Sequence, residues 1–168
     1  MTESELKLRD AEIQFRLALE NTGDEDVVRS CINSMITTAR SVTMVMERES
    51  AIHDALLSWY KTRIVNLKDS EHGVLLKYFN ENRTYTIHKG VVTPARLTAQ
   101  VTEFTKNGVP QPISPDATMI FYRFANPPGD KVDDSAGIFR LCRAYLDVMG
   151  ALVAEWLVQR NNLPKSGV

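Results

Sequence analysis

Apolar residues recur at steps of three and four along most of this chain, the spacing that gives an α-helix one buried face. The repeat is most regular between Ile138 and Leu157. The pattern predicts a mainly α fold, an up-and-down bundle of four to five helices. We expect helices over about 4–20, 24–49, 50–67, from Asp69 or Ser70 to about residue 88, and from Asp133 or Asp134 to about 160.

Each predicted helix has an apolar stripe that is expected to face the core. In the second helix the stripe includes Val28, Ile32, Met35, Ala39 and Met46. The stripes expected in the other early helices are Leu6, Ile13 and Leu17 in the first, Ile52, Leu56, Trp59 and Tyr60 in the third, and Val74, Leu75, Tyr78 and Phe79 in the fourth.

The segment from 91 to 130 has a different composition, because it contains six of the seven prolines. Residues Leu97–Phe104 and Thr118–Phe124 alternate like half-buried strands, with a loop expected over Lys106–Pro115. We therefore expect a β-hairpin or extended arm inserted between the fourth and the last helix. Long Pro-rich excursions of this kind are usually functional or poorly ordered, and a functional one would cover the cleft or dock on a second subunit.

Size and composition favour a single domain over residues 1–168, with 161–168 as a frayed tail. The chain is 43% hydrophobic, enough to bury a core. No apolar run approaches the roughly 20 residues that a membrane span requires, so no membrane association is expected. The acidic start Met1–Glu5 is unlike a signal peptide, and this favours a cytoplasmic protein.

The charge balance limits the ways in which the chain can bind a nucleic acid. Twenty basic and 21 acidic residues give a net charge of -1, which excludes binding by bulk positive charge. Any RNA contact must therefore be local. Cys31 and Cys142 fall on apolar faces, and the histidines lack metal-ligand spacing with them, so neither a metal nor another cofactor is expected.

An arginine and a histidine stand five residues apart where the fourth helix is expected to end. Arg83 is a permanent cation whose planar fork matches two phosphate oxygens, and His88 exchanges protons near neutral pH. On a regular helix the two positions are about 140° apart around the axis. They would converge only if the helix frays or bends after Tyr85, or if a second subunit completes the site.

Arg-x-x-x-x-His at the end of a helix, within a helical bundle, resembles the HEPN superfamily of prokaryotic RNases and RNA-binding domains. In that family Asn, Asp or His usually follows the arginine, whereas here Thr84 follows it and Asn82 precedes it. The resemblance implies a metal-independent endoribonuclease, toxin or defence related, that works as a homodimer on RNA. It also implies a cognate antitoxin or another partner protein.

The resemblance assigns a role to each residue of the motif. His88 would be the general acid or base, and Arg83 would stabilise the negative charge on the phosphate. Asn82, Thr84 and Lys89 would be secondary substrate contacts. Arg40, in the second helix, either extends to solvent or pairs with an acid such as Glu47, or it faces a phosphate cleft.

The alternative is a catalytically inactive HEPN-like helical module that binds RNA or another protein. In that case Arg83 pairs with Glu81 or closes the helix end, where a cation is stabilising. His88 then donates a hydrogen bond to a carbonyl. The enzyme hypothesis requires Arg83 and His88 to lie within reach of one phosphate, whereas the module hypothesis requires His88 to be packed or capped.

Overall fold

The computed structural model describes residues 1–88, 94–100, 103–106, 109–112, 118–124 and 137–163. Within these ranges it has five α-helices, which confirms the mainly helical class. They are α1 (Glu3–Glu20), α2 (Glu25–Ser50), α3 (Asp54–Asp69), α4 (Gly73–His88) and α5 (Ile138–Asn162). The described strands are β1 (Pro94–Gln100), β2 (Glu103–Lys106), β3 (Val109–Pro112) and β4 (Thr118–Phe124).

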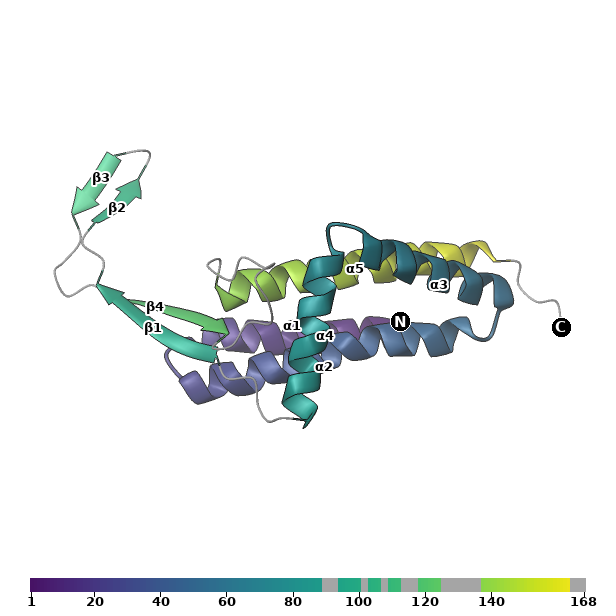
Figure 1. Ribbon diagram of the computed structural model, residues 1–168, viewed down its shortest axis with the longest axis horizontal. Helices are drawn as coiled ribbons and strands as arrows, with labels where there is room; N and C mark the ends of the chain where they lie inside the picture. The colour runs from purple at the N-terminus through teal and green to yellow at the C-terminus, as the bar shows by residue number, and fades with distance from the viewer. Residues whose placement is uncertain (89–93, 101–102, 107–108, 113–117, 125–136, 164–168) are drawn as a thin grey trace.

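Four helices run along the long axis of the molecule, and α4 lies across them (Figure 1). Successive helices α1, α2 and α3 alternate in direction, as an up-and-down bundle requires, but the fourth helix departs from this arrangement. The α3–α4 connection is as short as the α2–α3 connection, three residues in each case, but it directs α4 across the bundle. The Ser70 hydroxyl donates to the Leu67 carbonyl and accepts from the His72 N–H, and the new helix begins at Gly73.

The first two helices both begin directly after a capping residue. Thr2 and Glu5 form a reciprocal capping box at the start of α1. The Asp24 carboxylate accepts from the N–H groups of Asp26 and Val27, so the predicted start of the second helix is confirmed.

Three other predicted boundaries are wrong. Helix α2 continues through Ser50, so α3 begins at Asp54 and Ile52 lies in the turn between them, 78% exposed. Ser70 is the C-cap of α3, and neither it nor Asp69 caps α4. The N-cap of α5 is Gly137; the predicted caps, Asp133 and Asp134, lie outside the described residues.

Helix α1 turns a different stripe inward from the one expected. Leu6 and Leu17 are 40% and 38% exposed, while Ala11, Phe15 and Ala18 are buried. The buried stripe contains two small residues, which allow a close approach to the neighbouring helix α2. Val74 in α4 is also exposed, contrary to its predicted place in the core.

The core lies between α2 and α5, and α4 contributes Tyr78 and Phe79 to it. The inward residues of α2 named above are buried, and Leu157 of the stripe predicted for the last helix is partly buried. The other residues of that stripe are buried: Ile138, Leu141, Cys142, Tyr145, Leu146, Met149, Leu152, Val153 and Trp156. Trp156 in α5 donates its indole N–H to the Ser50 hydroxyl over 2.8 Å. The Ser50 hydroxyl in turn donates to the Met46 carbonyl.

The strands pair in two antiparallel sets. Strand β1 pairs with β4, from Pro94 opposite Phe124 to Gln100 opposite Thr118, and β2 pairs with β3. Strand β4 covers the second predicted strand, whereas the first overlaps both β1 and β2, and β3 lies in the predicted loop. The inserted hairpin as one unit stays a prediction. The inner end of β4 joins the core, because Tyr122 and Phe124 are buried.

Candidate functional site

The predicted catalytic pair lies on one continuous helix. Helix α4 extends from Gly73 to His88, with no end or break after Tyr85. The Cα atoms of Arg83 and His88 therefore stand about 140° apart around its axis, on different sides. The side chains of residues 82–84 and 88 lie outside the described part, as does the whole of Lys89. Convergence of the pair on one phosphate stays a prediction.

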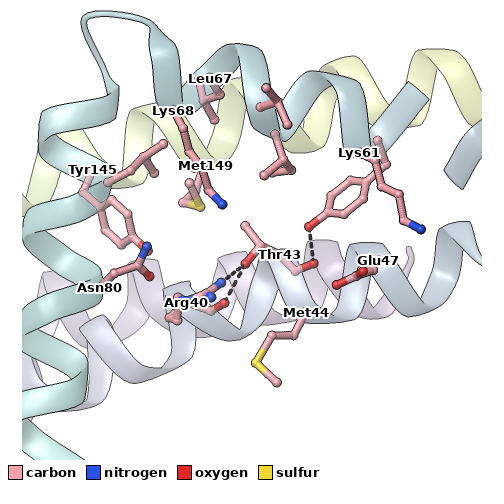
Figure 2. A pocket seen from close by; sticks show the side chains of 14 residues that line it. Arg40, Thr43, Met44, Glu47, Lys61, Leu67, Lys68, Asn80, Tyr145 and Met149 are labelled. Carbon is pink, nitrogen blue, oxygen red and sulfur yellow. Dashed lines mark hydrogen bonds between the residues drawn. The ribbon is translucent and has the colours of Figure 1, made fainter. Parts of the chain in front are cut away.

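A pocket of about 350 Å³ opens between α2, α3, α4 and α5 (Figure 2). Its apolar wall is built from side chains of all four helices: Met44, Ile64, Val65, Leu67, Leu76, Met149. The polar lining comprises Arg40, Thr43, Glu47, Tyr60, Lys61, Lys68, Asn80 and Tyr145. The predicted substrate contact Arg40 therefore faces a pocket.

Arg40 is held by its own helix at the edge of this pocket. Its guanidinium donates to the Thr43 hydroxyl, which donates back to the Arg40 carbonyl over 3.1 Å. Within the described ranges Arg40 and Glu47 form no ion pair, although both line the pocket. Arg40 thus lines a pocket, and its contact with a phosphate stays a prediction.

Tyr60 forms one wall and connects α3 to α2. Its hydroxyl donates to the Thr43 carbonyl over 2.6 Å. Burial raises the pKa of Tyr60 to about 12, and the nearby Glu47 carboxylate adds to the rise. The Arg40 charge and the hydrogen bond to Thr43 oppose it. Tyr60 is therefore a neutral hydrogen-bond donor at physiological pH.

Two lysines of α3 add positive charge to the pocket. Figure 2 shows the Lys68 ammonium directed into the space between the helices, toward the part that Arg40 and Asn80 also face. Lys61 and Glu47 lie at the other end of the pocket. Among the residues that the structure describes, none of these three cations forms a salt bridge. Arg63, by contrast, is engaged, because it forms two hydrogen bonds of 2.5 and 2.9 Å to Glu155 in α5.

The pocket and the motif share helix α4. Asn80 lines the pocket, and Arg83 follows three residues later, which is about one turn or 4.5 Å along the axis. The backbone of α4 thus brings the predicted catalytic arginine into the neighbourhood of Arg40, although the two residues are 43 positions apart in the sequence.

Sequence reasoning missed the two lysines, although the sequence contains a signal for them. Lys61 and Lys68 are seven residues apart, two helical turns, and so lie on one face of α3. Arg40 and Glu47 have the same spacing on α2. What the sequence does not give is the packing that sets these two faces opposite each other.

No helix in the described ranges is both long and apolar enough to cross a membrane. No protein-family model, curated protein or solved structure matches the chain.

Proposed function

We propose that the chain is a HEPN-like metal-independent endoribonuclease whose catalytic pair is Arg83 and His88. The observation that supports this is the position of α4, since Asn80 lines the same pocket as Arg40 and Arg83 follows one turn later. A substrate phosphate held near Arg40 would lie close to the motif.

The chemistry requires two proton transfers and stabilisation of negative charge. The 2′-hydroxyl of RNA attacks the adjacent phosphorus, a base removes the hydroxyl proton, and an acid protonates the departing 5′-oxygen. His88 suits either role, and such a group commonly contributes about 10²–10⁴ in rate. Arg83 binds the non-bridging oxygens as their charge increases.

A homodimer supplies what one subunit lacks. Because α4 stays helical to His88, one copy does not present Arg83 and His88 on the same side of the helix. We propose that two copies of α4 face each other, so that His88 of the second subunit provides the other proton carrier. Asn82, Thr84 and Lys89 then contact the RNA chain.

The biological setting follows from the resemblance to HEPN proteins. We propose a cytoplasmic, toxin or defence related enzyme that is controlled by a cognate antitoxin or other partner protein. The inserted arm at 91–130 would cover the cleft or dock on the second subunit.

A catalytically inactive HEPN-like RNA-binding or interaction module is the second candidate. It is favoured by the uninterrupted helix through His88, which separates the pair, and by Thr84 at a position usually occupied by Asn, Asp or His. In this case the pocket and α4 bind without cleaving.

Cleavage of a fluorescent structured RNA in EDTA tests the first candidate. His88→Ala and Arg83→Ala are compared with wild type, and His72→Ala and Arg16→Ala serve as matched controls, because both control side chains are well exposed. We expect the motif variants to lose at least about 100-fold in rate and the controls to keep wild-type rates. Circular dichroism and dimer mass establish that every variant is folded.

Two results would overturn the enzyme proposal. One is equal cleavage by wild type and both motif variants, which would point to a contaminating nuclease. The other is no cleavage of several RNAs by wild type. If RNA binding persists without cleavage, the inactive module becomes the better description.

A further inference from the structure

The charges in the pocket between α2, α3, α4 and α5 do not balance. Arg40, Lys61 and Lys68 contribute three positive charges and Glu47 one negative charge, in a chain whose net charge is -1. Among the residues that the structure describes, these cations have no carboxylate partner within salt-bridge distance. A surplus of two positive charges in a partly enclosed space attracts an anion.

The geometry favours phosphate over a single carboxylate. Arg40 from α2 and Lys68 from α3 approach the same part of the pocket from two sides, and the Asn80 amide lies beside them (Figure 2). A guanidinium fork and an ammonium can together contact several oxygens of one phosphate. A phosphate monoester carries about -1.5 to -2 charges at neutral pH, which matches the surplus.

The rest of the wall indicates what the phosphate is attached to. Ile64, Leu76 and Met149 give the pocket an apolar side, and Tyr145 adds an aromatic ring. A volume of about 350 Å³ is near the lower limit for ligand pockets. It therefore suits one small molecule and excludes a folded nucleic-acid segment.

We propose that this pocket binds one small phosphate monoester with an aromatic or apolar body, of which a mononucleotide is the natural example. Arg40 and Lys68 hold the phosphate, Asn80 hydrogen-bonds to its oxygens, and the apolar wall contacts the body. The source is either a free nucleotide or the 5′-phosphorylated end of an RNA. The second source rests on the proposed ribonuclease function, whereas the first does not.

Isothermal titration of the full-length protein tests the proposal. The probes are phenyl phosphate against benzoate, which share the ring and differ in the anion, and AMP against adenosine. We expect phenyl phosphate and AMP to bind at least about tenfold more tightly than benzoate and adenosine, with an affinity that falls as salt rises. A 5′-phosphorylated RNA trinucleotide, compared with its unphosphorylated form, distinguishes an RNA end from a free nucleotide.

Two variants assign the binding to the pocket. Lys68 is an exposed side chain, so Lys68→Ala is expected to fold, and Arg40→Ala removes the second cation. Each should weaken phenyl phosphate binding about tenfold or more, while Lys7→Ala and Arg16→Ala, both in α1 and away from the pocket, should not change it. If Arg40→Ala does not fold, Lys68→Ala alone decides.

The proposal is overturned if the wild type binds none of the phosphates, if it binds benzoate as tightly as phenyl phosphate, or if Lys68→Ala binds as tightly as wild type. Failure of the phosphate-binding proposal can be distinguished from failure of the ribonuclease proposal. RNA cleavage that depends on Arg83 and His88 would stand without phosphate binding in the pocket. Phosphate binding that depends on Lys68 would likewise stand in a protein that cuts no RNA.

Discussion

Tyr60 is both a wall of the pocket and a connection between two helices. Its pKa is raised to about 12, chiefly by burial, so the folded protein keeps the phenol protonated at a pH where the unfolded chain has lost the proton. The contribution of the protonated Tyr60 phenol to the free energy of unfolding is therefore complete below the unfolded pKa of about 10. It is lost as the pH rises toward the folded pKa of about 12.

Tyr60→Phe isolates this effect. Near neutral pH the variant should be less stable than wild type by about 0.5–1.5 kcal/mol, since the hydrogen bond to the Thr43 carbonyl is absent. Above about pH 10 the difference in the free energy of unfolding between wild type and Tyr60→Phe should shrink by up to about 1.4 kcal/mol per pH unit, because only wild type has this phenol to ionise. Urea unfolding at a series of pH values from about 8 to about 11 measures it, and a constant gap would contradict the assignment.

At the level of elements, the α3–α4 turn determines where α4 lies. A Cβ atom at Gly73 would stand 1.8 Å from the Lys68 carbonyl oxygen and 2.7 Å from its carbon, both backbone atoms that cannot rotate away. Glycine is needed here because of this close approach. The conformation of this turn is therefore restricted, and the chain continues from it into α4, which carries Asn80 and the motif.

Gly73→Ala should destabilise the protein by about 2 kcal/mol or more, because the backbone must move to admit the methyl group. Gly150→Ala is the matched control, since its Cβ would meet only the Leu8 side chain, at an ordinary 3.9 Å. In the interior of α5 this second change should stabilise by about 0.5–1 kcal/mol. Thermal and urea unfolding compare the two, and equal effects would show that the turn is not constrained.

The buried face of a helix could be predicted from the sequence where the helix has only one apolar stripe. In α5 the apolar residues form a single series, and the structure buries almost all of it. In α1 two stripes compete, and Leu6 and Leu17 stay partly exposed because Ala11 and Ala18 permit closer packing. Periodicity identifies a helix, but the size of the facing residues decides which side is buried.

The candidate site was less predictable, because it depends on how distant helices meet. Arg40 was recognised as a candidate, yet its place in a pocket depends on α3 and α4. Lys61 and Lys68 carry no motif of their own, and they became notable only when α3 lay beside α2. The α3–α4 turn brings Gly73 so close to the Lys68 backbone that no Cβ fits there, and no spacing rule reveals this close approach.

At the scale of the whole molecule, an aromatic cluster joins β4 to α4, which precedes the strands in the sequence, and to α5, which follows them. Phe124 of β4 makes edge contacts with Tyr78 and Phe79 of α4, at ring distances of 5.4 and 6.2 Å. Phe79 stacks on Tyr145 of α5 at 4.3 Å. The end of β4 is therefore part of the helical core.

Phe124→Ala should lower the free energy of unfolding by about 3–5 kcal/mol, since the side chain is only 1% exposed and leaves a cavity. Val158→Ala, at a position 56% exposed, should change it by less than about 0.5 kcal/mol. Urea unfolding followed by circular dichroism measures both. A loss below about 1 kcal/mol for Phe124→Ala would mean that β4 does not contribute to the core.

The hydrogen bond from Trp156 to Ser50 joins residues 106 positions apart, and the Arg63–Glu155 pair joins residues 92 apart. Both depend on α5, which follows the other described helices in the sequence. During synthesis on the ribosome, α1 to α4 can pack on one another first, but the side of the core that α5 covers stays open until α5 has left the exit tunnel. A nascent chain of this protein is therefore exposed to aggregation and to chaperone binding until α5 has emerged.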